Sequence, residues 1–111
     1  WGDGLQTRSF LYVDECVEGT LRLLRSGFSG PVNIGSDEMV SINELAKMII
    51  DISGKEISIK NIPGPEGVKG RNSHNDLIQR KLGWRPSQSL AVGLNTTFEW
   101  INRRVHGLIE N

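Results

Sequence analysis

Two polar clusters contain the residues best suited to bind an anion. The first is the trio Gln6, Thr7 and Arg8, which offers an amide, a hydroxyl and a guanidinium where a loop enters a predicted strand. The second is the Gly-rich stretch "GPEGVKGRNS", which contains Lys69 and Arg71. Arginine suits phosphate because its planar fork bonds two oxygens at once, and glycines let backbone N–H groups approach a ligand. The clusters predict a local phosphate site, with a solvated loop and an ordinary strand end as the alternatives.

The other reactive residue types favour no site of their own. His74 and His106 lie far apart, without cysteines or paired carboxylates at ligand spacing, so surface histidines are favoured over a metal site. Cys16 lies on the apolar side of a predicted helix without a basic neighbour, which favours a buried, inert thiol over a nucleophile. No Gly-rich motif follows a strand and opens a helix, so we predict no cofactor site within this sequence.

Composition narrows the function classes further. The 111 residues are enough for about one small domain. Thirteen basic residues balance thirteen acidic ones, so no overall charge attracts the chain to nucleic acid or to an anionic membrane. A single cysteine excludes an internal disulfide, which makes the cytoplasm the expected location, and no apolar run reaches the ~20 residues of a membrane span. Because the chain begins at Trp1 and enters a Gly-rich loop directly, we expect it to be part of a longer polypeptide.

The elements that must position these residues follow an α/β order. Apolar periodicity and turn residues predict strand, helix, strand, helix, strand, helix, helix. The predicted strands are too few for a covered parallel sheet, so we expect sequence upstream to complete it. Two tryptophans, Trp84 and Trp100, are expected to pack rather than to bind a ligand. The expected strands are 8–13, 31–35 and 56–62, and the expected helices run from an Asp14 N-cap to Gly27, from the Ser41/Glu44 capping box, over 76–82 and from Ser89.

Four stretches together resemble a known family. In order and spacing they are similar to the C-terminal part of nucleotide-sugar epimerases of the extended short-chain dehydrogenase/reductase family, also called the NAD-dependent epimerase/dehydratase family. The resemblance covers nearly the whole chain. The stretches are "GDGLQTRSFLYVDECVEGTLRLL", "PVNIGSDEMVSINELA", "IPGPEGVKGRNSHN" and "KLGWRPSQSLAVGL".

The resemblance implies a division of labour between two domains. Residues 1–111 would form the substrate-binding portion, while an N-terminal Rossmann domain, absent from this chain, would hold NAD. A helix at 14–26 would pack on that domain and a strand at 32–34 would join its sheet, so we expect exposed apolar surface in this chain alone. The family's nucleotide-sugar contacts fall on Gln6, Thr7 and Arg8, and its diphosphate-binding arginine falls on Arg71, with Lys69 beside it.

The same resemblance implies where the chemistry occurs. The family's catalytic residues and its NAD loop would lie upstream, so this chain would bind and orient a nucleotide-sugar and be inactive alone. In the complete enzyme, a homodimer, NAD would transiently oxidise the sugar at C4, which acidifies the protons at C3 and C5. Two alternatives remain open: another extended reductase, such as a sugar-nucleotide 4,6-dehydratase or decarboxylase, and a non-enzymatic module that binds phosphate or RNA.

Overall fold

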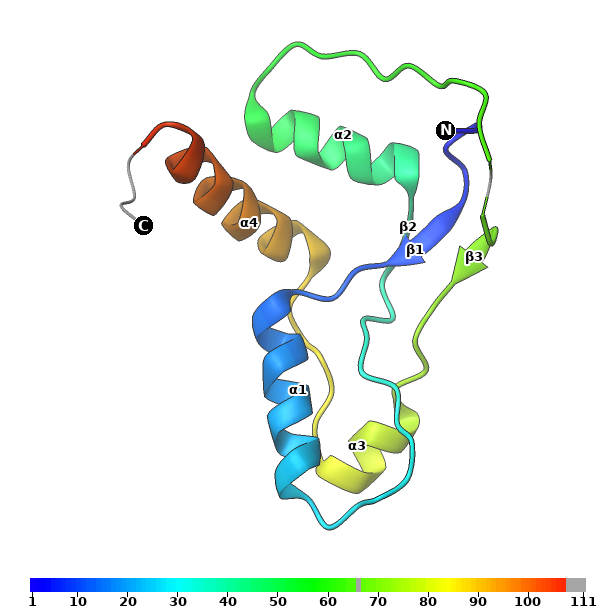
Figure 1. Cartoon of the computed structure of the whole chain (residues 1–111), viewed down its shortest axis with the longest axis vertical. Helices are drawn as coiled ribbons and strands as arrows, with labels where there is room; N and C mark the ends of the chain where they lie inside the picture. Colours follow the sequence, from blue (N-terminus) through cyan, green and yellow to red (C-terminus); the bar gives the residue numbers. More distant parts are fainter. Residues whose placement is uncertain (66, 108–111) are drawn as a thin grey trace.

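The computed structural model describes residues 1–65 and 67–107. Figure 1 shows a small sheet with α2 and α4 toward one end of the molecule and α1 and α3 at the other. The chain is therefore a mixed α/β structure, as predicted. Its elements are β1 (Thr7–Ser9), α1 (Val13–Arg25), β2 (Met39–Ser41), α2 (Ile42–Ser53), β3 (Gly70–Arg71), α3 (Asp76–Leu82) and α4 (Leu90–Val105).

The sheet brings the two polar clusters together. Its order is β2-β1-β3, with β1 antiparallel to β2 and parallel to β3. In the parallel pair, Thr7 lies opposite Gly70 and Arg8 lies opposite Arg71. The Thr7 N–H donates to the Lys69 carbonyl oxygen at 2.8 Å, which extends the pairing by one residue. Residues more than sixty positions apart in the sequence thus become neighbours on adjacent strands.

The chain encloses very little apolar core. Among the described residues, only Ile78 and Leu90 are buried apolar side chains. The accessible surface is 8065 Å², against about 6,100 Å² for a compact monomer of this mass. The radius of gyration is 16.8 Å, against about 13 Å for a compact domain of this length. These helices and strands therefore leave much of their apolar surface without a partner, which confirms the expected exposure.

Three of the four predicted helices have the expected boundaries. The Ser41 hydroxyl accepts from the Glu44 N–H, and the Glu44 carboxylate accepts from the Ser41 N–H at 2.7 Å, so the capping box at α2 is present. Helix α3 covers 76–82 and ends at Gly83, whose φ of 61° is the left-handed conformation common after helices. Ser89 caps α4 through the Val92 N–H.

The first strand and helix differ from the prediction at their junction. The strand expected over 8–13 is limited to β1, and the helix begins at Val13 rather than after Asp14. Tyr12 is the N-cap residue and makes no side-chain capping bond. Asp14 instead lies in the first turn of α1, where its negative charge is favourable near the helix N-terminus.

Two predicted strands are wrong, and two observed strands were missed. Residues 31–35 and 56–62 form no strand, because no partner strand lies beside them among the described residues. An alternating or β-branched pattern indicates a preference for extended backbone and cannot supply that partner. Strands β2 and β3 are only three and two residues long, which is too short for a periodic pattern.

The expectations for three core candidates had different outcomes. Trp84 packs as predicted, since a methyl group added at Gly19 of α1 would lie 2.6 Å from its ring. Cys16 is exposed, so the prediction of a buried thiol is wrong. Trp100 is 55% exposed, with the Arg104 guanidinium 5.2 Å from its ring centre, so the prediction of core packing is also wrong. Both errors come from assuming that the apolar faces of α1 and α4 are covered within this chain.

Candidate functional site

Arg8 and Arg71 line one open hollow of about 420 Å³ beside the sheet. As partners in the parallel register they direct their side chains to the same face. Within residues 1–65 and 67–107, neither guanidinium forms an ion pair with a carboxylate. Two unpaired cations beside one concave surface favour the binding of a ligand with negative charge. The remaining walls come from Ser9, Leu11, residues 32–36, Asn72 and Ser73.

Arg8 is the more constrained of the two arginines. It is partly buried, and its Nη1 donates to the Thr7 carbonyl oxygen at 2.7 Å. Its Nη2 lies 3.8 Å from the position of a methyl group added at Gly67. Gly67 lines a second hollow, so the Arg8 guanidinium lies close to both hollows.

Two other predicted site residues line the second hollow. It has a volume of about 240 Å³ and contains Gln6 and Lys69 together with Asp3, Leu5 and Gly67. Thr7 lines neither hollow, and its hydroxyl faces Gly70. The structure therefore divides the predicted residues into an arginine group, a Gln6/Lys69 group and a threonine that packs against β3.

Two glycines of the 64–73 loop lie close to other residues of the chain, which the sequence alone did not show. A methyl group at Gly64 would lie 2.5 Å from the Trp1 ring, and one at Gly70 would lie 3.0 Å from the Thr7 hydroxyl. These two positions need glycine because the chain itself approaches them. Gly64 and Gly70 thus have a structural role apart from any contact with a ligand, whereas Gly67 has no such close neighbour.

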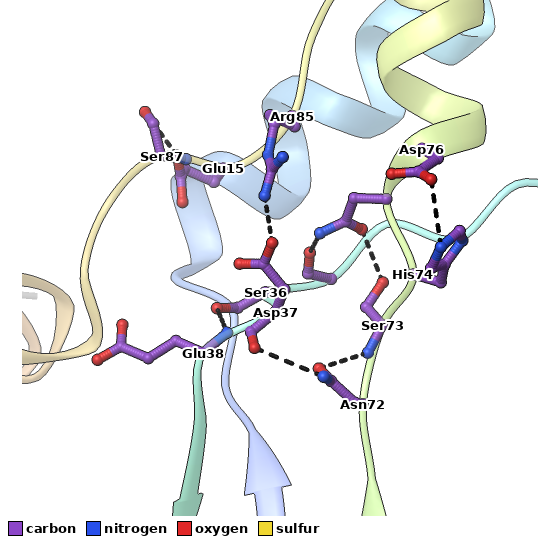
Figure 2. A network of polar contacts seen from close by, with 12 residues as sticks. Glu15, Ser36, Asp37, Glu38, Asn72, Ser73, His74, Asp76, Arg85 and Ser87 are labelled. Atoms are coloured by element: carbon purple, nitrogen blue, oxygen red, sulfur yellow. Dashed lines mark hydrogen bonds and ion pairs between the residues drawn. The ribbon is translucent and has the colours of Figure 1, made fainter.

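A network of polar contacts fixes the loop that follows Arg71, as Figure 2 shows. The Asn75 side-chain amide donates to the Gly35 carbonyl oxygen at 2.8 Å, and its oxygen accepts from the Ser73 hydroxyl at 2.8 Å. The Asn72 amide reaches the Asp37 carbonyl oxygen at 3.5 Å, and the Asp37 carboxylate pairs with Arg85. The sequence showed these polar residues but not their partners, which lie 35 to 48 residues away.

Two glutamates join distant segments of the chain by accepting bonds from backbone N–H groups. The Glu15 carboxylate accepts from the backbone N–H groups of Ser87 and Gln88 at 2.6 and 2.9 Å. The Glu38 carboxylate accepts from the Leu90 N–H, the first residue of α4, at 2.8 Å. Sequence reasoning missed both roles, because a glutamate on a helix or in a loop is usually solvated.

Comparison with solved structures places this fold in a class of enzymes. UDP-glucose 4-epimerase from Thermotoga maritima, solved with UDP-glucose, matches 95% of this chain and 34% of its own, with a TM-score of 0.89 and 30% identity. UDP-glucuronic acid 4-epimerase from Bacillus cereus, solved with NAD, matches 96% of this chain and 33% of its own, with a TM-score of 0.80 and 31% identity. In fold and sequence, this chain matches about a third of the length of these epimerases, which are structures of the extended short-chain dehydrogenase/reductase class.

Within that class, the sequence is similar to one enzyme in particular. GDP-mannose 3,5-epimerase from Arabidopsis thaliana is 60% identical over 105 residues, which is 95% of this chain and 28% of that enzyme. The dTDP-4-dehydro-6-deoxy-D-allose reductase from Streptomyces bikiniensis is 39% identical over 90% of this chain and 31% of its own length. No family model matches the chain. The chain thus spans less than a third of the length of these curated relatives.

Proposed function

We propose that the hollow between Arg8 and Arg71 binds the diphosphate of a nucleotide-sugar. In this proposal the chain is the substrate-binding portion of an NAD-dependent epimerase that acts on GDP-mannose or a similar substrate. The observation that carries it is the parallel register of β1 and β3, which places on one hollow two guanidinium groups that have no carboxylate partner among the described residues. Each guanidinium offers a fork of donors that matches phosphate oxygens, and two forks match a diphosphate.

The two hollows suit an elongated ligand with its charge near the middle. Arg8 lines the larger hollow and approaches Gly67 of the smaller one, so a diphosphate beside Arg8 leaves space on both sides. Gln6 and Lys69 then contact one end of the ligand, and Asn72 and Ser73 the other. Thr7 contributes indirectly in this arrangement, because its hydroxyl packs against β3.

We propose that NAD is held by the part of the complete enzyme outside this chain. A dinucleotide cradle needs glycines where a strand turns into a helix. At the turn from β2 into α2 the capping residue is Ser41, and Tyr12 precedes α1. This chain therefore contributes binding and orientation of the substrate, which in enzymes is worth several kcal/mol of the activation barrier. We expect the chain to have no epimerase activity alone.

The apolar residues left exposed on α1 support a role within a larger enzyme. Val13, Val17 and Leu24 are 61%, 52% and 80% exposed, on a helix with a charged opposite side. We propose that this face packs on the NAD-binding domain of the complete polypeptide. We further propose that the complete enzyme is cytoplasmic and homodimeric, with the dimer contact outside this chain.

Sequence identity favours an epimerase over the competing enzymes. Identity to the GDP-mannose epimerase is 60%, against 39% for the reductase and 34% for UDP-glucuronic acid decarboxylase 1 from Danio rerio. A phosphate- or RNA-binding module is the remaining alternative. RNA binding would weaken steeply with added salt and would ignore the sugar, whereas a nucleotide-sugar site should discriminate between sugars.

The test is an amide NMR titration of the 111-residue chain with GDP-mannose, with ADP-ribose as a control that also carries a diphosphate. We expect saturable shifts at residues 6–8 and 69–73, larger for GDP-mannose and requiring about 10- to 100-fold more ligand in Arg71→Ala. The same chain is also inserted into the Arabidopsis enzyme in place of its matching segment. A folded chimera with unchanged KM for GDP-mannose after Arg71→Ala would overturn the proposal.

A further inference from the structure

We propose that Asn75 is a positioning residue that holds the Arg71 guanidinium over the hollow. This inference rests on the proposed function of that hollow. Asn75 is 5% exposed and does not line the hollow itself, so it acts through other residues.

The Asn75 side chain joins two walls of the hollow. Its Nδ2 donates to the Gly35 carbonyl oxygen and its Oδ1 accepts from the Ser73 hydroxyl, each at 2.8 Å. Gly35 and Ser73 both line the hollow, on segments 38 residues apart. The walls are in close contact, since a methyl group added at Gly35 would lie 2.6 Å from the Ser73 Cβ. A shift of Ser73 would therefore displace the loop that continues from Arg71.

The hydrogen bonds of the Asn75 side chain are not those of a helix cap. Asn75 occupies the N-cap position of α3, where asparagine commonly accepts a bond from the first turn of its helix. Here it makes no such bond, and its amide instead reaches across to Gly35. The interaction is directed at the hollow rather than at the helix.

Arg71 depends on such support because β3 is short. The strand contains only Gly70 and Arg71, and on its N-terminal side the Thr7 N–H bonds to the Lys69 carbonyl. On its C-terminal side the buried anchor is Asn75. The nearby Asn72 is exposed and its bond to the Asp37 carbonyl is longer, at 3.5 Å, so it is the weaker support.

The test is a double-mutant cycle on binding of GDP-mannose to the 111-residue chain, or to the chimera with the Arabidopsis enzyme. We expect Asn75→Ala to weaken affinity at least about fivefold when Arg71 is present and less than about twofold in the Arg71→Ala background. Asn75→Asp keeps the size of the side chain and the oxygen that accepts from Ser73 but loses the donor to Gly35, and it should give the same pattern if Asn75→Ala fails to fold. His74→Ala is the matched control in this loop, because the His74 side chain is exposed and lies next to Asp76 rather than at the hollow.

A measurement without ligand separates positioning from general loss of stability. We expect Asn75→Ala to speed hydrogen exchange at the Thr7 amide while the amides of α2 keep their rates, and His74→Ala to change neither. Equal affinity losses in both Arg71 backgrounds, or an unchanged Thr7 amide, would overturn the inference. If the wild-type chain and chimera both fail to bind GDP-mannose, the proposed function fails, and Thr7 exchange alone decides whether Asn75 positions the loop.

Discussion

The arginine end of the sheet is held by specific polar contacts, whereas the outer face of α1 is left uncovered. At the sheet end, polar groups from distant segments bond to one another: the Asn75 amide donates to the Gly35 carbonyl oxygen, and Asp37 pairs with Arg85. On the outer face of α1, defined by Val13, Val17, Leu21 and Leu24, large apolar groups are left between 38% and 80% exposed. A hollow lined by two arginines and an uncovered apolar surface thus lie in one small chain.

The difference shows that the site can be ordered even though the core is incomplete. Hydrogen bonds and strand register are directional, so a few of them set the place of Arg8 and Arg71. Apolar contact has no direction and stabilises in proportion to the area removed from water. The predictions below test whether the two regions respond to substitution as differently as this implies.

The largest expected effect is at the turn that anchors β1. Gly4 has a φ of 73°, and a methyl group there would overlap the Asn43 side chain, whose amide donates to the Asp3 carbonyl oxygen at 2.8 Å. Gly4→Ala should lower the free energy of unfolding by about 3 kcal/mol, from backbone strain plus the lost bond. Urea unfolding measures it. Gly54→Ala is the control, because Gly54 has a similar φ of 63° with open space around it; equal losses would contradict the role of the Asn43 contact.

The next effect concerns ligand affinity rather than stability. Arg71→Ala should weaken binding of GDP-mannose by about 10- to 100-fold, the range for one hydrogen-bonded charged group. Arg71→Lys should recover only part of the loss, since an ammonium keeps the charge without the fork. Calorimetry on the chimera gives the dissociation constants. Arg80→Ala on α3 is the control away from the hollow, and a loss there as large as at Arg71 would indicate a general charge effect.

A smaller effect is expected at the start of α2 and depends on pH. Bonds from the backbone and hydroxyl of Ser41, with a lesser contribution from Lys47, hold the pKa of Glu44 below its ordinary value of 4.5. The stabilisation is therefore complete above the pKa of the unfolded chain and is lost as the pH falls through the lowered folded value. Unfolding measured between about pH 6 and pH 3 should show a steeper acid loss in wild type than in Glu44→Gln.

The capping hydroxyl gives a companion test at neutral pH. Ser41→Ala should lower the free energy of unfolding by about 1 kcal/mol, the usual value for an N-cap. Its acid dependence should lie between those of wild type and Glu44→Gln, because the Ser41 N–H still donates to the Glu44 carboxylate. An unchanged acid dependence in both variants would show that the capping box does not control this titration.

The smallest effect is expected on the outer face of α1. Leu24→Lys should change the free energy of unfolding by no more than about 0.5 kcal/mol, because Leu24 is already 80% exposed. Binding of a hydrophobic dye should fall, since a charge interrupts the apolar surface. Fluorescence of the bound dye and thermal unfolding measure the two responses. A loss of stability above 2 kcal/mol would show that this face is packed in solution.

Local signals were predictable from the sequence, and long-range partners were not. The Ser41/Glu44 capping box and the Gly83 turn depend on residues within one helical turn, so they were found correctly. The predicted strands at 31–35 and 56–62 failed because strand formation needs a partner that the pattern does not specify.

The candidate site, too, could be predicted only in part from the sequence. Family resemblance indicated Arg8 and Arg71, and the structure supplies the register that makes them neighbours. Asn75 and Gly35 could not be identified beforehand, because a bond across 40 residues leaves no mark in either local sequence. The depth of burial of Cys16 was misjudged for a related reason: the amphipathic pattern of α1 shows which side is apolar and not whether anything covers it.

The bonds from Glu15 to Ser87 and Gln88 also have a consequence for biosynthesis. They join positions 72 and 73 residues apart. The paired strands β1 and β3 are separated by nearly as many residues. Contacts of high sequence separation form late, because a long loop must close before they are made. During translation α1 and α2 can form as they emerge from the ribosome, whereas the arginine pair is assembled only after synthesis has passed Arg71. We therefore expect a bound ligand to stabilise the pairing of β1 with β3 once it has formed, at the last step of folding. It should not initiate folding.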